Sequence, residues 1–418
     1  MINIFKYPDL KRKMLFTLFV IVVFRLFSHI PVPGVDVAAI KAYLSGNALF
    51  GLFDMFSGGG FQNFSIVTLG LAPYINASII IQLLTFMVPS LEELAKEGEY
   101  GREKINMYTR FLTVPITFFQ AYGIYFFLMK QGVISPLSLF DLVVLIFTLL
   151  AGSLFLVWVG ELVSEYGVGN GISLLIFVSI IGRLPQALYG FGSSLSADNF
   201  INNMIFALLA VAVIVAVVLV NEGTRNIVIE YGRRGIRSTK VTNFLPIKIN
   251  QAGVIPIIFA VAIVGLPSML SAPLSASGNA GLRNLGVFLG QNFTQNSIAY
   301  NALYFILVLG FAYFYTSVQF NAEKIAEDVK KKGGFVPGIR PGKSTERYLK
   351  NIVTKITLLG GIFLGLIAIM PFLVQSFVGI SVLTIGGTGL LIVVSVVLET
   401  LRQVESMTTT RSYERFLD

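Results

Sequence analysis

Residues 356–398 read ITLLGGIFLGLIAIMPFLVQSFVGISVLTIGGTGLLIVVSVVL, a run of 43 residues without a single Asp, Glu, Lys or Arg. One helical crossing of a bilayer takes about 20 apolar residues, so this run is long enough for two crossings and a turn. Pro371 and Gly379 are residue types that favour such a turn. The stretch therefore predicts a pair of membrane-spanning helices.

The rest of the chain repeats this pattern. No charged side chain occurs from Met55 to Leu91, from Ile249 to Leu282 or from Asn284 to Ala322. Over all 418 residues, 55% are hydrophobic, 13% are charged and the mean hydropathy is +0.78, which excludes a set of soluble domains. We predict an all-α polytopic membrane protein with ten spans, at about 14–27, 72–88, 111–129, 142–162, 172–190, 201–221, 252–270, 298–318, 352–372 and 381–399.

The basic residues predict the orientation of these spans. Ten spans leave both termini on one side, which also receives 26 of the 31 Lys and Arg residues, while four fall on the other side and Arg25 lies within the first span. By the positive-inside rule, both termini are expected in the cytoplasm. The first span lacks a small-residue cleavage site after it, so we expect it to be retained.

Several kinds of active site are excluded by composition. The chain has no Cys and one His, His29, so neither thiolate nor His-cluster metal sites are expected, and no cofactor is predicted. Gly167-Val168-Gly169-Asn170-Gly171 lacks the Lys of a phosphate-binding loop. Acidic residues within the spans are too scarce for a typical ion-coupled carrier. We do not expect an enzyme.

The stretch from Gly51 to Pro73 is too apolar for a solvated loop, yet its apolar part is too short to cross the membrane. Gly58, Gly59 and Gly60 form a flexible hinge before the segment Phe64 to Leu69, which includes Ile66. We expect a re-entrant segment at about 57–70. It either fills space or acts as a movable stopper in a pore.

The second span carries an aliphatic stripe and several polar side chains. Ile75, Ile79 and Leu83 fall at i, i+4 and i+8, so they share one face of a helix. Asn76 and Gln82 are costly facing lipid and are expected to face protein or water. The seventh span resembles it, with Asn250-Gln251 at its cytoplasmic end and Ile258 deeper. The stripe either faces lipid and core or has a role in a pore.

Two long cytoplasmic connections, at about 222–250 and 319–350, are basic. The second contains Pro337-Gly338 and Pro341-Gly342 on either side of Arg340, which predicts a tight tip with a projecting guanidinium. Attraction to lipid headgroups and a docking platform for a cytoplasmic partner both fit these loops.

Five motifs, taken together, resemble the bacterial SecY protein translocation channel family. They occur in the order of that family along most of the chain: Leu71-Ala72-Pro73-Tyr74-Ile75-Asn76-Ala77-Ser78-Ile79-Ile80-Ile81-Gln82-Leu83-Leu84, Glu97-Gly98-Glu99-Tyr100-Gly101-Arg102, Gly167-Val168-Gly169-Asn170-Gly171-Ile172-Ser173, Ala252-Gly253-Val254-Ile255-Pro256 and Phe335-Val336-Pro337-Gly338-Ile339-Arg340-Pro341-Gly342.

The resemblance implies a pore between two pseudo-symmetric inverted halves of five spans, here residues 1–196 and 197–418, in the bacterial plasma membrane. It also implies a short plug helix at about 57–70 that caps a constriction. Matching positions for the constriction ring are Ile75, Ile79, Ile172, Ile176, Ile258 and Ile392. Such a ring can exclude water and ions, yet part around any passing sequence.

The resemblance further implies a lateral gate between the second and seventh spans, through which signal sequences reach lipid. We expect Asn76, Gln82, Asn250 and Gln251 to hold it shut. Docking of the SecA motor ATPase or the ribosome is expected at Arg233, Arg234, Arg340 and Lys343. SecE-like and SecG-like small subunits, membrane lipids and signal-bearing polypeptides are the other implied partners. The alternative is a secondary transporter of a small solute, which also uses inverted repeats.

Overall fold

The computed structural model describes residues 8–33, 35–45, 57, 59–182, 184, 185, 189, 192, 200–231, 241–275, 277–294, 296–378 and 387–414. The chain divides into two compact units, one formed by Met1–Ser193 with Val396–Asp418 and the other by Ser194–Ser395. Each unit is described by itself. The division into halves expected at 196/197 remains a prediction.

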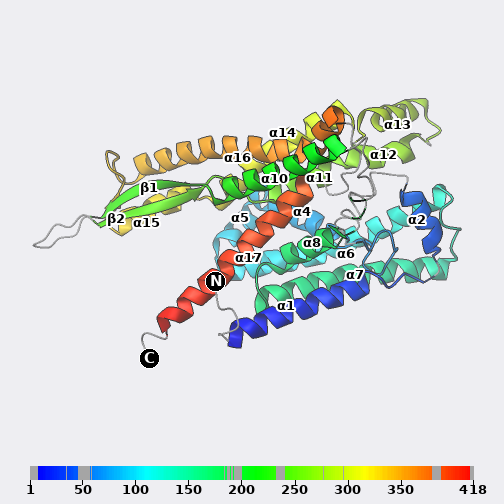
Figure 1. Ribbon diagram of the computed structural model, residues 1–418, viewed down its shortest axis with the longest axis horizontal. Helices are drawn as coiled ribbons and strands as arrows, with labels where there is room; N and C mark the ends of the chain where they lie inside the picture. The colour runs from blue at the N-terminus through cyan, green and yellow to red at the C-terminus, as the bar shows by residue number, and fades with distance from the viewer. Residues whose placement is uncertain are drawn as a thin grey trace, which may run out of the picture. The chain divides into compact units, whose positions relative to one another are not determined.

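The first unit is helical (Figure 1). Its elements are α1 (Pro8–Phe27), α2 (Val37–Ser45), α4 (Ala72–Met87), α5 (Pro89–Lys96), α6 (Glu99–Lys130), α7 (Leu139–Tyr166) and α8 (Gly171–Ile181), and the part of α17 (Gly387–Glu414) from Val396 onward. One hydrophobic core joins α2, α6 and α7 around Ile40, Leu128 and Leu149, all 0% exposed.

The second unit combines helices with three strands. In chain order these are α10 (Phe200–Glu222), β1 (Thr224–Tyr231), β2 (Val241–Lys248), α11 (Ile255–Val264), α12 (Leu266–Ser275), α13 (Ala280–Asn292), α14 (Ile298–Gln319), α15 (Ala322–Lys331), β3 (Gly334–Phe335), α16 (Lys343–Val378) and the start of α17. Helices α14 and α16 run side by side (Figure 1) and share a core with α11 that includes Val264, Val308 and Leu364.

Five helical stretches among the described residues are long and apolar enough to cross a membrane, and a sixth span results if α4 and α5, bent by 102°, count as one. The apolar helices α8 and α11 are shorter than a bilayer crossing. The predicted span 252–270 is divided between α11 and α12 at Gly265. The helical membrane fold is thus confirmed, whereas the number of ten spans remains a prediction.

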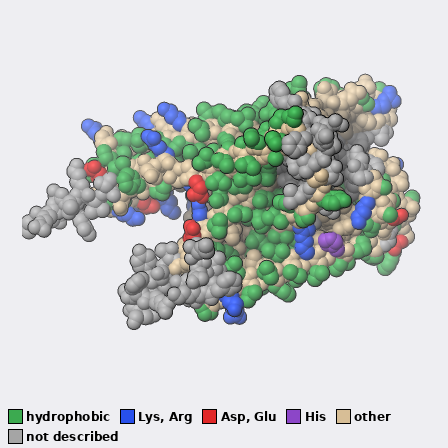
Figure 2. Space-filling model, viewed as in Figure 1, with side chains coloured by type: hydrophobic (Ala, Val, Ile, Leu, Met, Phe, Trp, Pro, Cys, Tyr) green, Lys and Arg blue, Asp and Glu red, His purple; other side chains and the backbone are tan. Residues whose placement is uncertain are grey.

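Large apolar side chains cover much of the surface. Phe119 on α6 and Leu208 on α10, for example, are both 72% exposed. In Figure 2 hydrophobic side chains dominate the visible faces of the helices. A water-facing surface of this kind would favour aggregation, so the exposed apolar side chains are explained by contact with lipid.

The sequence analysis did not predict the small sheet of the second unit. Its strand order is β2-β1-β3, and both pairs are antiparallel. Strand β3 pairs with β1 over two positions, Glu230 with Phe335 and Tyr231 with Gly334. The sheet therefore joins the two long basic connections, which lie about 100 residues apart in sequence, into one body.

Candidate functional site

Helices α4 and α8 carry the four ring positions of the first unit. Ile79 and Ile176 are buried, while Ile75 and Ile172 are half-buried. Helix α8 begins at Gly171 because the Asn170 side chain accepts a hydrogen bond from Ser173 N at 3.1 Å. The site of a Cβ on Gly160 lies 3.2 Å from Ile172 Cγ1, so Ile172 packs close to α7.

The glycine-rich connection between α7 and α8 fixes the start of α8. Gly171 N donates to Ser164 Oγ at 2.9 Å, and a Cβ at residue 171 would lie 1.8 Å from the Gly160 carbonyl oxygen. Only glycine permits this approach of two backbones. Residues 167–171, which lack the Lys of a phosphate-binding loop, therefore form a tight connection between α7 and α8 that positions Ile172 and Ile176.

Two ring positions lie in the second unit, Ile258 on α11 and Ile392 on α17. Their neighbours Ile257 and Leu391 belong to the core that α11 shares with α14 and α16, whereas Ile258 and Ile392 are not among the described residues of that core. Ile392 is 1% exposed and Ile258 is half-buried, so both side chains are packed within the second unit.

The expected plug lies in the first unit at Ser57 and residues 59–71, and Gly58 lies outside the described residues. Within the expected plug, Ser57 is helical, residues 59–64 and 66–71 form turns, and Ser65 pairs with Pro31 in a β-bridge. Short-range bonds such as Phe64 N to Phe61 O (3.1 Å) and Thr68 N to Ser65 O (2.9 Å) hold these turns. Positive φ values of 86° at Gly59, 40° at Phe64 and 55° at Gly70 interrupt a helical path.

This segment of turns is buried inside the first unit, as expected of a re-entrant segment. Phe61, Phe64 and Leu69 belong to the core with α2, α6 and α7, and Ser65 and Thr68 are at most 2% exposed. The Thr68 hydroxyl donates to Gly60 O at 3.2 Å and to Ser65 O at 2.5 Å. The segment is therefore a packed element and not a solvated loop.

The polar residues expected at the gate have different surroundings. Gln82 Nε2 donates to Ser78 Oγ at 3.1 Å within α4, and Asn76 is half-buried on the same helix. Gln251 is half-buried before α11. Asn250, 7% exposed, donates through Nδ2 to Asn221 Oδ1 at 2.8 Å.

Asn221 extends this contact into a chain of side-chain hydrogen bonds. Its Nδ2 donates to Ser395 Oγ at 2.8 Å, so the chain links the end of α10, the residues before α11 and the middle of α17. All three residues belong to the second unit. The Asn250 amide is thus satisfied within its own unit, which sequence reasoning missed because Asn221 and Ser395 are distant in sequence.

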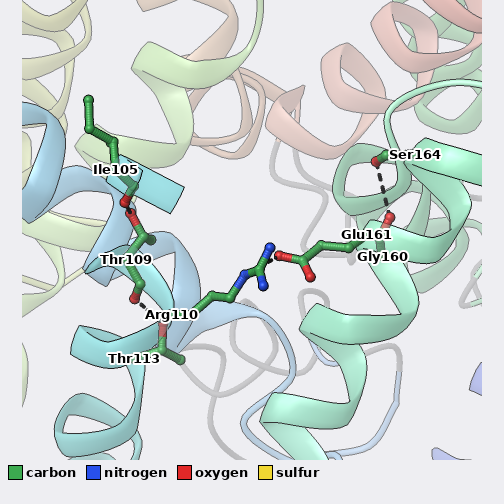
Figure 3. Close-up of polar contacts among 7 residues, drawn as sticks. All are labelled: Ile105, Thr109, Arg110, Thr113, Gly160, Glu161 and Ser164. Carbon is green, nitrogen blue, oxygen red and sulfur yellow. Dashed lines mark hydrogen bonds and ion pairs between the residues drawn. The ribbon is translucent and has the colours of Figure 1, made fainter. Parts of the chain in front are cut away.

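An ion pair between α6 and α7 was also missed. Arg110 Nε lies 2.6 Å from Glu161 Oε1, and Figure 3 shows the two side chains extending toward each other from adjacent helices. On the same helices, the hydroxyls of Thr109, Thr113 and Ser164 donate to carbonyls one turn earlier. Both charged side chains are partly exposed, so the pair contributes at most about 1 kcal/mol.

The sheet, α15 and the first turns of α16 form one body in the second unit, here called the basic body (residues 224–231, 241–248 and 322–353). Its core consists of Ile227, Ile247, Ala326, Val336, Leu349 and Val353. A Cβ on Gly334 would lie 2.8 Å from Tyr231 Cε1, so β3 packs closely against the side chains of β1. The basic body therefore has a hydrophobic core of its own.

The tip with Arg340 projects from the basic body. Ile339 N donates to Val336 O at 3.0 Å, and Gly338 has a φ of 78°, which are the features of a type II turn with Pro337 at its second position. The buried Thr345 hydroxyl donates to Arg340 O at 3.0 Å, which fixes the backbone of Arg340 while its side chain stays exposed.

Other basic side chains surround this tip. Lys343 begins α16 and is exposed, as are Lys330, Lys332 and Arg347. In Figure 2 Lys and Arg side chains gather around the end of the second unit that carries β1, β2 and α15. Arg233 and Arg234 lie outside the described residues. Within the part of the chain that is described, no group of His, Asp and Glu is arranged to hold a metal ion.

Comparisons with known proteins agree on one family. The SecY family model matches residues 65–401. The chain is 40% identical to the protein translocase subunit SecY of Streptomyces galbus, over 99% of this chain and 98% of that protein. It is 42% identical to the protein translocase subunit SecY of Thermus thermophilus, over 98% and 95%.

Solved structures with a similar fold are protein channels. One, described as the structure of a protein conducting channel, has a TM-score of 0.65 at 19% identity and covers 95% of this chain and 92% of that chain. Another is Sec61 in the canine ribosome-channel complex, with a TM-score of 0.60, the same identity and the same coverage. At this identity the likeness extends to the fold alone.

Proposed function

Because the chain belongs to the SecY family, we propose that it is a passive protein-conducting channel and not an enzyme. It passes unfolded secretory polypeptides across the plasma membrane and releases membrane helices sideways into lipid. The observation that carries this function is the 40% identity to protein translocase subunits over 99% of the chain. A small-solute transporter would need a polar cluster at the membrane midplane, whereas the chain supplies aliphatic side chains at the matching positions.

The constriction of this channel is a ring of six isoleucines: Ile75, Ile79, Ile172, Ile176, Ile258 and Ile392. Support comes from their positions on four separate helices and from the burial or half-burial of all six side chains. Aliphatic side chains form no obligatory hydrogen bonds with a substrate, so they seal a narrow pore against ions and part around varied sequences.

The re-entrant segment at about residues 57–70 is the plug that closes the resting channel. The description of one similar structure, with a TM-score of 0.64 at 19% identity, states that the plug domain of SecY stabilises the closed state of the translocation channel and maintains a membrane seal. The burial of Phe61, Phe64 and Leu69 in the first unit supports a resting, seated position.

Helices α4 and α11 line the lateral gate in this proposal. Asn76 and Gln82 on α4 and Gln251 before α11 are half-buried and supply polar contacts there. Asn250 acts indirectly, since its bond to Asn221 anchors the start of α11 inside the second unit. When an apolar signal sequence enters the lateral gate, its contacts with α4 and α11 replace these polar contacts.

The basic body is the docking platform, and it lies in the cytoplasm together with both termini. The exposed Arg340 and Lys343 support contact with an acidic or phosphate-rich partner, for which the SecA motor ATPase and the ribosome are the candidates. Arg233 and Arg234, which lie outside the described residues, are proposed to contribute to the same docking function. SecE-like and SecG-like subunits and anionic lipids complete the set of proposed partners.

Reconstitution tests this function directly. The chain, purified with its small subunits and placed in liposomes, is supplied with SecA, ATP and a secretory precursor. We expect the precursor to become protected from added protease, and we expect Arg340→Glu to remove that protection. If parental channels protect no precursor although SecA binds them, the proposed function is wrong.

A further inference from the structure

Gly152, in the middle of α7, lies directly against the backbone of the plug. A Cβ at this position would lie 2.0 Å from the Ile66 carbonyl oxygen and 2.8 Å from the Ile66 carbonyl carbon. Contacts this short do not occur between real atoms, and the atoms approached belong to the backbone. Any residue larger than glycine therefore requires the backbones of the plug and α7 to move apart.

The residues that follow α1 also hold the plug. Val32 N donates to Phe64 O at 2.9 Å and Ile66 N donates to Ile30 O at 3.0 Å, so Pro31 and Ser65 form an antiparallel bridge. The plug backbone thus contacts both α7 and residues 30–32. A displacement of Phe64 and Ile66 from their places disturbs these two hydrogen bonds.

The seated plug also contains a strained residue. Phe64 has a φ of 40°, the only positive value of a residue other than glycine in the described part of the chain. A side chain disfavours this conformation, and here the ring is fully buried. The contacts around the plug therefore hold Phe64 in a conformation that it would leave if the segment were free. Small changes in these contacts alter the fraction of time that the plug remains bound in the first unit.

From these contacts we infer that Gly152 is a positioning residue that sets the balance between the seated and the displaced plug. It does so by leaving room for the Ile66 carbonyl. This inference rests on the proposed function of residues 57–71 as a plug. It predicts that the side chain at residue 152 controls both the ion leak of the resting channel and its discrimination against defective signal sequences.

Gly152→Ala tests the inference, with Gly123→Ala as the matched control. Gly123 is also inside a helix of the first unit, but a Cβ there meets nothing within 4 Å. We expect Gly152→Ala to raise the resting ion conductance of reconstituted channels at least about tenfold and to permit export of a precursor with a defective signal sequence. Gly123→Ala should change neither. Unchanged conductance in Gly152→Ala overturns the inference.

Deletion of residues 60–69 separates a seating effect from a folding effect. Without the plug, Gly152→Ala has no Ile66 carbonyl to displace, so it should add no further conductance and should not lower the amount of channel in the membrane. If Gly152→Ala raises the ion conductance of the deletion channel further, or still lowers the amount of channel in the membrane, the substitution causes a general packing defect. Either result overturns the inference.

A disulfide across the bridge tests the plug itself. Pro31 and Ser65 face each other as a non-hydrogen-bonded antiparallel pair. The Cα atoms of such a pair are about 4.5 Å apart, which suits a disulfide, and the natural chain contains no Cys that could interfere. Oxidised Pro31→Cys/Ser65→Cys channels should lose export and regain it on reduction. Normal export by the oxidised channel contradicts the plug function. If oxidation blocks export but Gly152→Ala channels keep the low resting conductance of the parent, the plug function stands and only the role of Gly152 is contradicted.

Discussion

Ile227→Ala tests whether the basic body is a folded platform that exists before any partner binds. Ile227 is 4% exposed on the central strand β1 and packs in the core of this body. The substitution removes three buried carbon atoms, worth about 0.8 kcal/mol each in transfer free energy, and leaves a cavity. The expected loss of local stability is about 3 kcal/mol, within the usual range for such changes.

Hydrogen exchange measures this loss. A local loss of about 3 kcal/mol corresponds to a roughly hundredfold faster exchange of the amides in β1 and β2 when exchange follows local opening. The neighbouring Asn226→Ala is the control, because Asn226 is exposed on the same strand. We expect it to leave exchange nearly unchanged.

The same variant links folding to function. We expect Ile227→Ala to reduce SecA-driven export, since the platform that presents Arg340 opens more often. Exchange rates in β1 and β2 that match those of the parent would refute the packed body. Fast exchange with normal export would refute the requirement for a folded platform.

Three further predictions concern docking, sealing and the anchor of α11. Arg340→Glu should abolish motor-dependent export at normal channel levels, measured as protease-protected precursor; export at the parental rate would exclude a docking role. Ile79→Asn and Ile258→Asn should each raise ion conductance in planar bilayers, and an unchanged conductance would count against the ring. Asn250→Leu removes the donor to Asn221 Oδ1 and should cost about 1–3 kcal/mol, seen as a lower Tm in detergent; an unchanged Tm would contradict that bond.

Features set by local sequence were predicted closely. The span expected at 298–318 corresponds to α14 at Ile298–Gln319, and the span at 72–88 corresponds to α4 at Ala72–Met87. Both follow from uncharged stretches of bilayer length, and Pro73 marks a helix start. The projecting Arg340 was likewise predictable, because Pro-Gly pairs specify their own turns.

Features that depend on distant partners were not predictable. Alternating apolar residues such as Ile227 and Ile229 are a strand signal, but the pairing of β1 with β3 requires contacts across about 100 residues. The apolar composition predicted a re-entrant segment, and the family resemblance implied a plug helix. The turns of the plug depend on the positive φ of Phe64, which is maintained by burial against α2, α6 and α7.

The most direct test of the central claim is the path of a translocating polypeptide. Because the chain has no Cys, single cysteines can be introduced at chosen positions and oxidised with a cysteine in a stalled precursor. The account predicts disulfide adducts for Ile79→Cys and Ile258→Cys, and none for Phe119→Cys, which is 72% exposed on the surface of α6. Adducts at residue 119 in place of residues 79 and 258 would contradict a polypeptide path through the isoleucine ring.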